Sequence, residues 1–147
     1  MSYFGALDIG ASALTAQRLR MDIISQNIAN ANTTRTEDGT PYRRRVVIFR
    51  ESSDGIPFSE YLSESSKARY LGKGVKVSAI AEDTSPFRRV YDPGHPDADE
   101  DGYVEMPNVD IVTEMVNMIS ATRAYEANVT AMNTTKSMAM KALEIGR

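Results

Sequence analysis

Residues 7–34 read "LDIGASALTAQRLRMDIISQNIANANTT", and two mostly apolar series run through them at intervals of seven residues. The first series is Leu7, Leu14, Met21 and Ile28, and the second, three residues further along, is Gly10, Gln17, Ile24 and Ala31. This spacing is typical of a narrow coiled-coil seam. Because residues 3–31 contain no proline, we expect a helix of roughly 40 Å there, at ~1.5 Å per residue. Such a helix needs a partner to bury its seam.

The last turns of this predicted helix are rich in asparagine and threonine. Asn27, Asn30, Asn32 and Thr33 follow one another closely, while Ile28 keeps the apolar rhythm between them. Short amides and hydroxyls bond to nearby backbone in non-helical conformations, so such a cluster usually marks a helix end. We therefore expect the helix to finish here with polar groups that contact another segment.

A second long helix is predicted at the C-terminal end of the chain. After Pro107, residues at alternating spacings of four and three form a stripe, in which Thr122 and Lys136 are the polar interruptions: Ile111, Met115, Met118, Thr122, Tyr125, Val129, Met132, Lys136, Ala139 and Leu143. The pattern predicts a helix from about Val109 to Ile145, with Pro107 at its start and Gly146 as its stop. Two matching seams favour a coiled coil; the alternative is two helices of a globular bundle.

The middle of the chain has β-strand character. "TPYRRRVVIFRES" (40–52), "GKGVKVSAIAED" (72–83) and "SPFRRVYDPGHP" (85–96) are each predicted as strands. Segments 51–69 and 92–102 are rich in Ser, Asp, Gly and Pro and are predicted loops. The predicted fold is mainly α with a small antiparallel β insertion: a coiled-coil helix in 1–32, a β-rich region in 33–106 and a coiled-coil helix in 107–147.

Composition narrows the possible functions. The 147 residues include no cysteine, which excludes disulfides and thiolate sites, and the net charge of −3 favours neither nucleic acid nor a membrane surface. No window approaches ~18 uninterrupted apolar residues, so we expect no membrane insertion, and residues 1–12 do not have the pattern of a cleavable signal peptide. Eight methionines and no tryptophan indicate a thin, extended core.

An acidic run offers a candidate calcium site. Asp97, Asp99, Asp101 and Gly102 match the first half of an EF-hand loop, but Asn108 stands where the loop needs a bidentate glutamate. Pro107 precedes it, and the residues before the run cannot form the entering helix. We interpret the run as a solvated acidic turn and expect no metal.

Basic residues and the single histidine offer little further chemistry. Arg43–Arg45, Arg50, Arg88 and Arg89 could mark a nucleic-acid patch, but successive side chains on a strand point to opposite faces, so the triplet Arg43–Arg45 cannot form one patch. We interpret these residues as exposed strand charges that discourage wrong pairing, or as partners of acidic neighbours. His95 sits in a Pro-Gly-His-Pro turn, and no G-x-S-x-G or P-loop pattern occurs. We expect no enzyme activity and no cofactor.

The helix end carries a resemblance to a known family. "ISQNIANANT" (24–33) resembles the S-x-N-I-A-N-x-x-T signature of the bacterial flagellar rod and hook axial proteins. The matching residues are Ser25, Asn27, Ile28, Ala29, Asn30 and Thr33. "GTPYRRRVVIF" (39–49), "VYDPGHPDAD" (90–99), "GYVEMPNVDIVTEMVNMISATRAYEANV" (102–129) and "ALEIGR" (142–147) are similar to the proximal-rod members of that family. The resemblance is weakest between about residues 50 and 70.

The resemblance implies a structural subunit of the flagellar basal body. Its paired terminal helices would line the inner core of a tubular proximal rod, a drive shaft that spans the periplasm and transmits torque, with the middle region outside. Implied partners are copies of itself, other rod subunits, the basal-body adaptor protein and the type III export apparatus. Export would then need no cleavable signal peptide. The alternative is a soluble coiled-coil adaptor that does not polymerise.

Both helices contribute to the expected assembly seam. Its predicted members are Leu7, Leu14, Met21, Ile24, Ile28, Ile111, Met115, Met118, Tyr125, Val129, Met132 and Leu143. Asn27 and Asn30 are expected to make hydrogen bonds between subunits or from helix to β region, because short amides can satisfy helix-end carbonyls and a second partner together. The alternative is that they cap their own helix.

Overall fold

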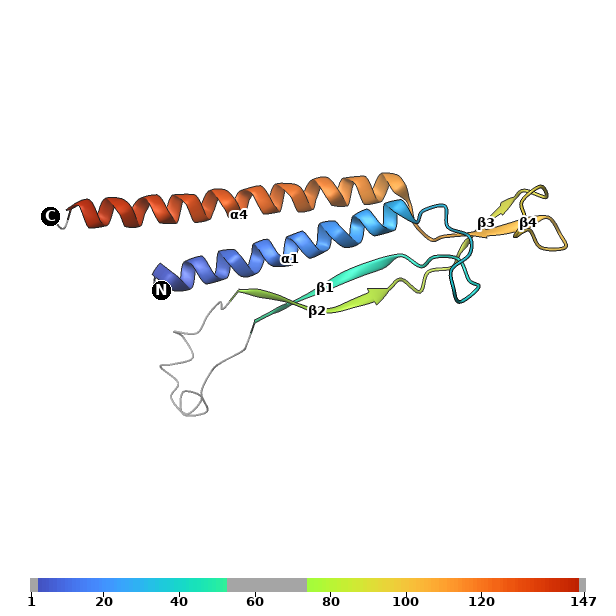
Figure 1. The fold of residues 1–147 in the computed structure, drawn as a ribbon, viewed down its shortest axis with the longest axis horizontal. Coiled ribbons are helices and arrows are strands. Elements are labelled where there is room, and N and C mark those ends of the chain that lie inside the picture. The colour runs from blue at the N-terminus through green and yellow to red at the C-terminus, as the bar shows by residue number, and fades with distance from the viewer. Residues whose placement is uncertain (1–2, 53–73, 146–147) are drawn as a thin grey trace, which may run out of the picture.

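Two long antiparallel helices and a β-hairpin form three elongated layers in the computed structural model, which describes residues 3–52 and 74–145 (Figure 1). The central layer is helix α1 (Tyr3–Ala29), with helix α4 (Ile111–Ile145) along one side. On the other side, α1 contacts strands β1 (Arg45–Glu51) and β2 (Val75–Glu82). The predicted mainly α fold with a small antiparallel β region is confirmed at this level.

Both helices end close to the predicted boundaries, with differences that have local causes. α1 stops at Ala29, two residues early, because the chain turns through Asn30 and Thr33, where the Thr33 N–H donates to the Asn30 carbonyl at 3.1 Å. α4 begins at Ile111, so the expectation that Pro107 starts the helix is wrong. Asp110 caps it instead, because its side-chain oxygens accept from the backbone N–H groups of Val112 and Thr113. Gly146 lies outside the described residues.

The strands in the described part of the chain form two separate antiparallel pairs. β1 pairs with β2, with an irregularity between Ile48 and Phe49, and β3 (Arg88–Tyr91) pairs with β4 (Tyr103–Met106). Sequence analysis missed β4, because its four residues are too short to show alternation and follow Gly102, whose φ of 78° forms the turn. Of the predicted loop 51–69, Glu51 ends β1 and 53–69 lie outside the described residues.

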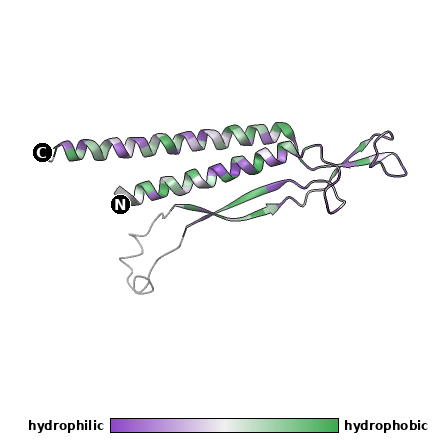
Figure 2. Ribbon diagram, viewed as in Figure 1, coloured by the Kyte–Doolittle hydropathy of each residue, from purple (hydrophilic) through white to green (hydrophobic). Residues whose placement is uncertain are grey.

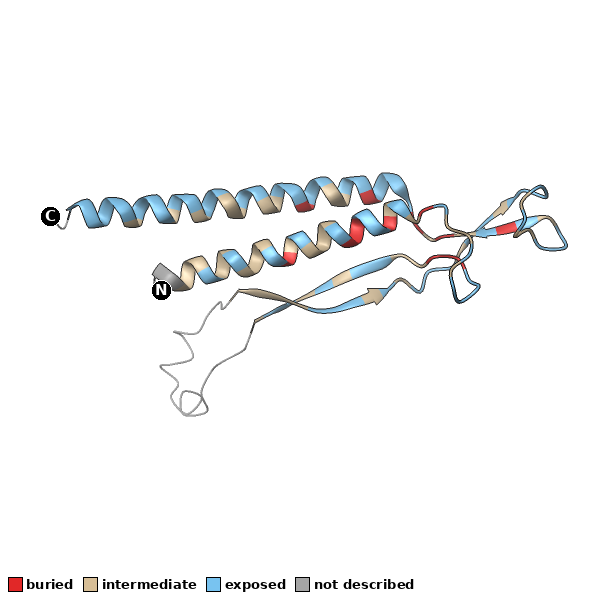
Figure 3. Ribbon diagram, viewed as in Figure 1, coloured by how far each residue is buried: buried red, intermediate tan, exposed pale blue. Residues whose placement is uncertain are grey.

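Burial is concentrated where α1, α4 and β1 meet. Figure 3 shows buried positions along the middle layer and near the start of α4, while most of the outer surface of α4 is exposed. Ile23 and Ile24 of α1 are buried, as is Ala121 of α4. Figure 2 shows apolar segments along all three layers, including surfaces that are exposed in Figure 3. The interior is therefore thin.

Two glycines permit close approaches between layers. A side chain on Gly10 would lie 2.7 Å from Met132 Cγ, so α1 and α4 are in contact at this level. Gly74 precedes β2 with a φ of 95°, and a Cβ there would overlap the Ser12 hydroxyl. The same hydroxyl accepts the backbone N–H of Val75 at 3.1 Å, which joins β2 to α1.

Neither α1 nor α4, within their described residues, contains a segment long and apolar enough to cross a membrane.

Candidate assembly site

Asn27, a residue of the family signature, joins three segments near the end of α1. It is 1% exposed, and its Nδ2 group donates to the Arg45 carbonyl and to Glu114 Oε2, both at 2.9 Å. Its Oδ1 atom accepts from the Tyr42 hydroxyl at 2.9 Å and from the Arg45 backbone N–H at 3.0 Å. The Asn27 amide forms hydrogen bonds with both the N–H and the carbonyl of Arg45, in the way that the backbone of a neighbouring strand would. All four bonding positions of the side chain are used.

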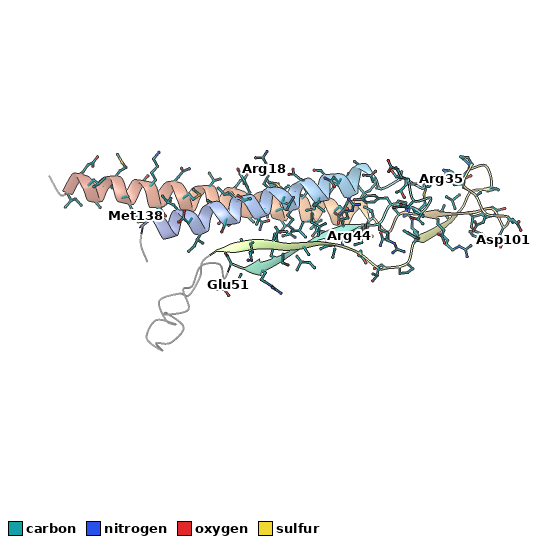
Figure 4. All side chains as sticks on the ribbon, turned by 60° about the horizontal axis from the view of Figure 1, so that its bottom comes forward. Arg18, Arg35, Arg44, Glu51, Asp101 and Met138 are labelled. Atoms are coloured by element: carbon teal, nitrogen blue, oxygen red, sulfur yellow. The ribbon has the colours of Figure 1, made fainter. Side chains whose placement is uncertain are left out.

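Glu114 supplies the negative charge of this junction. It is fully buried in α4, and its Oε1 atom accepts from Arg44 Nε at 2.9 Å and Nη2 at 2.8 Å. Asn117 donates to the same oxygen at 3.4 Å. A buried carboxylate needs such partners, because an unpaired charge in this position would be strongly destabilising. Figure 4 shows Arg44 among the dense side chains where β1 begins.

Arg44 connects Glu114 to the segment that follows β2. Its Nη1 atom lies 3.4 Å from Asp83 Oδ2. Burial acts to lower the pKa of Arg44, but the hydrogen bonds and charges of Glu114 and then Asp83 outweigh it, so the pKa is raised. The pKa of Asp83 is lowered, first by the hydroxyl and backbone N–H of Ser85 and then by Arg44. Both groups are therefore held in their charged forms.

Tyr42 and Asn108 complete the junction. Burial raises the pKa of the Tyr42 hydroxyl, which keeps it protonated as the donor to Asn27. Asn108 Oδ1 accepts the Arg44 backbone N–H at 2.8 Å, and its Nδ2 group donates to the Asp83 carbonyl at 3.0 Å. The junction thus ties the chain before β1 to the segments after β2 and before α4.

The other signature residues have local roles or face solvent. Asn30 donates to the Gln26 carbonyl at 2.9 Å and accepts from the Thr33 hydroxyl at 3.2 Å, both within the helix end. Ser25 and Ala29 are exposed, and Ile28 is half-buried. Of the two asparagines singled out, Asn27 makes bonds from helix to β region and Asn30 bonds its own helix end.

The structure divides the expected seam residues into an inner and an outer set. In α1, Ile24 is buried and Leu7, Leu14, Met21 and Ile28 are half-buried; in α4, Met118, Tyr125, Val129 and Met132 are half-buried. Contacts such as Met21 Sδ to the Thr122 hydroxyl, 3.6 Å, show that the helices face one another. Ile111, Met115 and Leu143 are exposed, so the α1–α4 contact leaves these three uncovered.

The stripe of α4 residues that is buried in the structure, the inner stripe, is rotated around the helix relative to the predicted apolar stripe. It follows the same spacing of four and three and consists of Glu114, Met118, Ala121, Tyr125, Asn128, Met132, Thr135 and Ala139, all buried or half-buried. Five of these eight positions are polar or small, namely Glu114, Ala121, Asn128, Thr135 and Ala139, and for that reason the apolar pattern did not reveal the stripe.

The arginines and the acidic run are distributed among separate contacts. Arg43 lies over the Phe87 ring at 4.3 Å from its centroid, whereas Arg44 enters the junction. Asp97 accepts from the Thr34 hydroxyl at 2.9 Å and lies 3.7 Å from Arg35. Within residues 3–52 and 74–145, no group of three or more acidic or histidine side chains is arranged to hold a metal ion.

Apolar side chains on the outside of α4 remain uncovered. Val112, Val116 and Ile119 are 67%, 61% and 54% exposed. Isolated exposed apolar residues are ordinary, but a contiguous set is typical of a protein–protein interface. The candidate assembly site is therefore this outer face together with the inner seam.

Comparison with known proteins assigns both ends of the chain to one class. Residues 7–35 match the family model described as flagella basal body rod protein, and residues 100–145 match that of the flagellar basal body rod FlgEFG protein C-terminal region. Both describe structural proteins of the flagellar rod, and the class is not enzymatic.

Curated relatives define the family within that class. The flagellar basal-body rod protein FlgC of Bacillus subtilis is 55% identical, with 100% of both chains covered. FlgC of Borreliella burgdorferi is 49% identical over 99% of this chain and 98% of the relative. FlgC of Salmonella typhimurium is 42% identical over 100% of both. The chain belongs to the FlgC family.

Proposed function

We propose that the chain polymerises, with copies of itself and with other rod subunits, into the proximal rod, a tubular drive shaft that transmits torque. The observation that carries the proposal is the exposed apolar face of α4 on a body only three layers thick. Covering that face in an assembly removes apolar surface from water, which is favourable at about 25 cal/mol per Å². A thin subunit with such a face gains much of its stability from its neighbours.

In this proposal, α1 and α4 pair as a coiled coil that lines the inner core of the rod. The spacing of four and three in the inner stripe of α4 supports this, as do the antiparallel contacts with α1. Residues 33–106 would form the outer layer. The exposed Ile111, Met115 and Leu143 would be seam positions against a neighbouring subunit.

The proposed location is the periplasm-spanning rod of the basal body. The chain would reach it through the flagellar type III export apparatus without a cleavable signal peptide. Its other partner would be the basal-body adaptor protein at the base of the rod.

A direct test replaces the native chain with a tagged copy and isolates basal bodies. We expect the chain in the rod fraction at a fixed ratio to other rod proteins, and loss of motility when the chain is removed. A chain that stays in the soluble fraction with one bound partner would favour the alternative, a coiled-coil adaptor that does not polymerise.

A further inference from the structure

The β1–β2 hairpin has one face toward α1 and an opposite face that no described element covers. Val46, Val47 and Phe49 line a groove between β1, α1 and the start of α4. Val47 and Phe49 are half-buried on this side. Successive strand residues point to opposite faces, so the exposed Ile48 points away from α1, as does most of the exposed Val46 at the rim of the groove. Their cross-strand partners are Ala79 and Ala81. Valine and isoleucine beside two alanines make a shallow apolar face that a helix can approach closely.

The outer face of α4 has matching properties. Ala121 is fully buried against α1 and marks the inner side of the helix. At 3.6 residues per turn, Val112, Val116 and Ile119 lie on the opposite side, where each is more than half exposed. They form an apolar stripe about two turns long.

These two faces lie on opposite sides of the molecule, because α1 separates α4 from the hairpin (Figure 1). We propose that the outer face of α4 in one copy covers the outer face of the β1–β2 hairpin in the next copy. A contact between two different faces does not close into a dimer and continues from copy to copy. This inference rests on the proposed function and names one contact between subunits within it.

Two charged residues indicate the axial offset that we expect between neighbouring copies. Asn27 bonds both Arg45 and Glu114, so β1 and α4 start at one level and then run in the same direction (Figure 1). Arg50 lies about 16 Å along β1, at ~3.3 Å per residue. Glu126 lies about 18 Å along α4, at ~1.5 Å per residue. Both are exposed, and neither side chain forms an ion pair with another described residue. Arg50 and Glu126 are therefore nearly level within one copy, so their opposite charges favour neighbouring copies that sit at equal height.

Charge exchange tests this pairing in cells that carry the variant in place of the native chain. We expect Arg50→Glu and Glu126→Arg each to reduce incorporation into basal bodies by about tenfold, because like charges would meet at every such contact. The combined variant should restore incorporation. Full incorporation of either single variant, or no recovery in the combined one, would overturn the proposed contact.

Cysteine pairs test the contact geometry, and the absence of native cysteine makes any disulfide assignable. Ile48→Cys with Ile119→Cys should give intermolecular links in oxidised basal bodies, whereas Ile48→Cys with Thr130→Cys, some 16 Å further along α4, should not. Incorporated protein that lacks the first link, or forms both equally, would contradict the inference and leave the proposed function intact. Failure of the unmodified chain to enter basal bodies would instead remove the proposed function.

Discussion

Asn27 of α1 donates a hydrogen bond of 2.9 Å to the carboxylate of Glu114 in α4, although the two residues are 87 positions apart. Both side chains are almost completely withdrawn from solvent. Because the same amide bonds both backbone groups of Arg45, one side chain sets the relative position of two helices and a strand. The signature asparagine therefore has a role inside the subunit.

The first prediction compares the two signature asparagines. Asn27→Ala should lower the free energy of unfolding of the purified subunit by about 2 to 4 kcal/mol, since it leaves buried groups of Glu114, Tyr42 and Arg45 unpaired. Asn30→Ala, which removes bonds within an exposed helix end, should cost about 1 kcal/mol or less. Urea unfolding measures both. Equal losses would mean that the junction does not carry the stability assigned to it.

The second prediction uses two glycines with similar backbone angles. Gly39→Ala, with a φ of 75° and open space around the site, should cost about 1 kcal/mol for the left-handed conformation alone. Gly74→Ala should cost about 1 to 3 kcal/mol more, because its side chain would also displace Ser12 from the β2 contact. Thermal unfolding of the two variants checks the difference. A Gly74 variant as stable as the Gly39 variant would show that α1 and β2 can separate at little cost.

The third prediction separates contacts within the subunit from contacts between subunits. Ala121→Asp places a charge in the α1–α4 contact and should unfold the subunit, since an unpaired buried charge costs several kcal/mol. Met115→Asp changes an exposed position, so helix content by circular dichroism should stay unchanged while rod incorporation is lost. Normal incorporation of the Met115 variant would remove that residue from the assembly seam.

The fourth prediction concerns acid. The pKa of Asp83 is lowered chiefly by Ser85, and that of Asp110 by the hydroxyl and backbone N–H of Thr113. A carboxyl whose pKa is lower in the folded than in the unfolded chain stabilises the fold at pH values above its unfolded-state pKa. This stabilisation is lost as the pH falls from the unfolded-state pKa to the folded-state pKa. The urea midpoint should therefore drop between about pH 5 and pH 3.

The matched control for the acid prediction is the double variant Asp83→Asn and Asp110→Asn. Asparagine keeps helix-capping ability at position 110 but cannot titrate. Its urea midpoint should change less over the same pH range than that of the native chain. If the urea midpoint of the double variant falls with pH as steeply as that of the native chain, other carboxyls are responsible for the acid sensitivity.

The long helices could be predicted from the sequence because their spacing of four and three extends over many turns. The face on which they meet could be predicted only in part. Met118, Tyr125, Met132 and Ala139 lie in both the predicted and the observed stripe. Ile111, Met115 and Leu143 of the predicted stripe are left exposed. Apolar pattern alone cannot distinguish a face buried within one chain from a face left for another.

The junction could not be predicted because its partners are distant in the chain and polar. Glu114 has the appearance of an ordinary surface residue until Arg44 and Asn27 are placed beside it. Alternation along the predicted strand did indicate that Arg43 and Arg44 point in different directions, which the structure shows. The capping role of Asp110 was hidden by Pro107, which is itself a common residue at helix starts.

The polar junction has a mechanical consequence for a load applied along the long axis. Apolar side chains can exchange neighbours when two helices slide by one heptad, about 10 Å, with little change in contact energy. The same slide would pull Glu114 away from Arg44 and Asn27 and leave a bare carboxylate in the interior. Among the described contacts between the two helices, this junction, near the start of α4, is therefore the one whose rupture by shear would leave a buried charge unpaired.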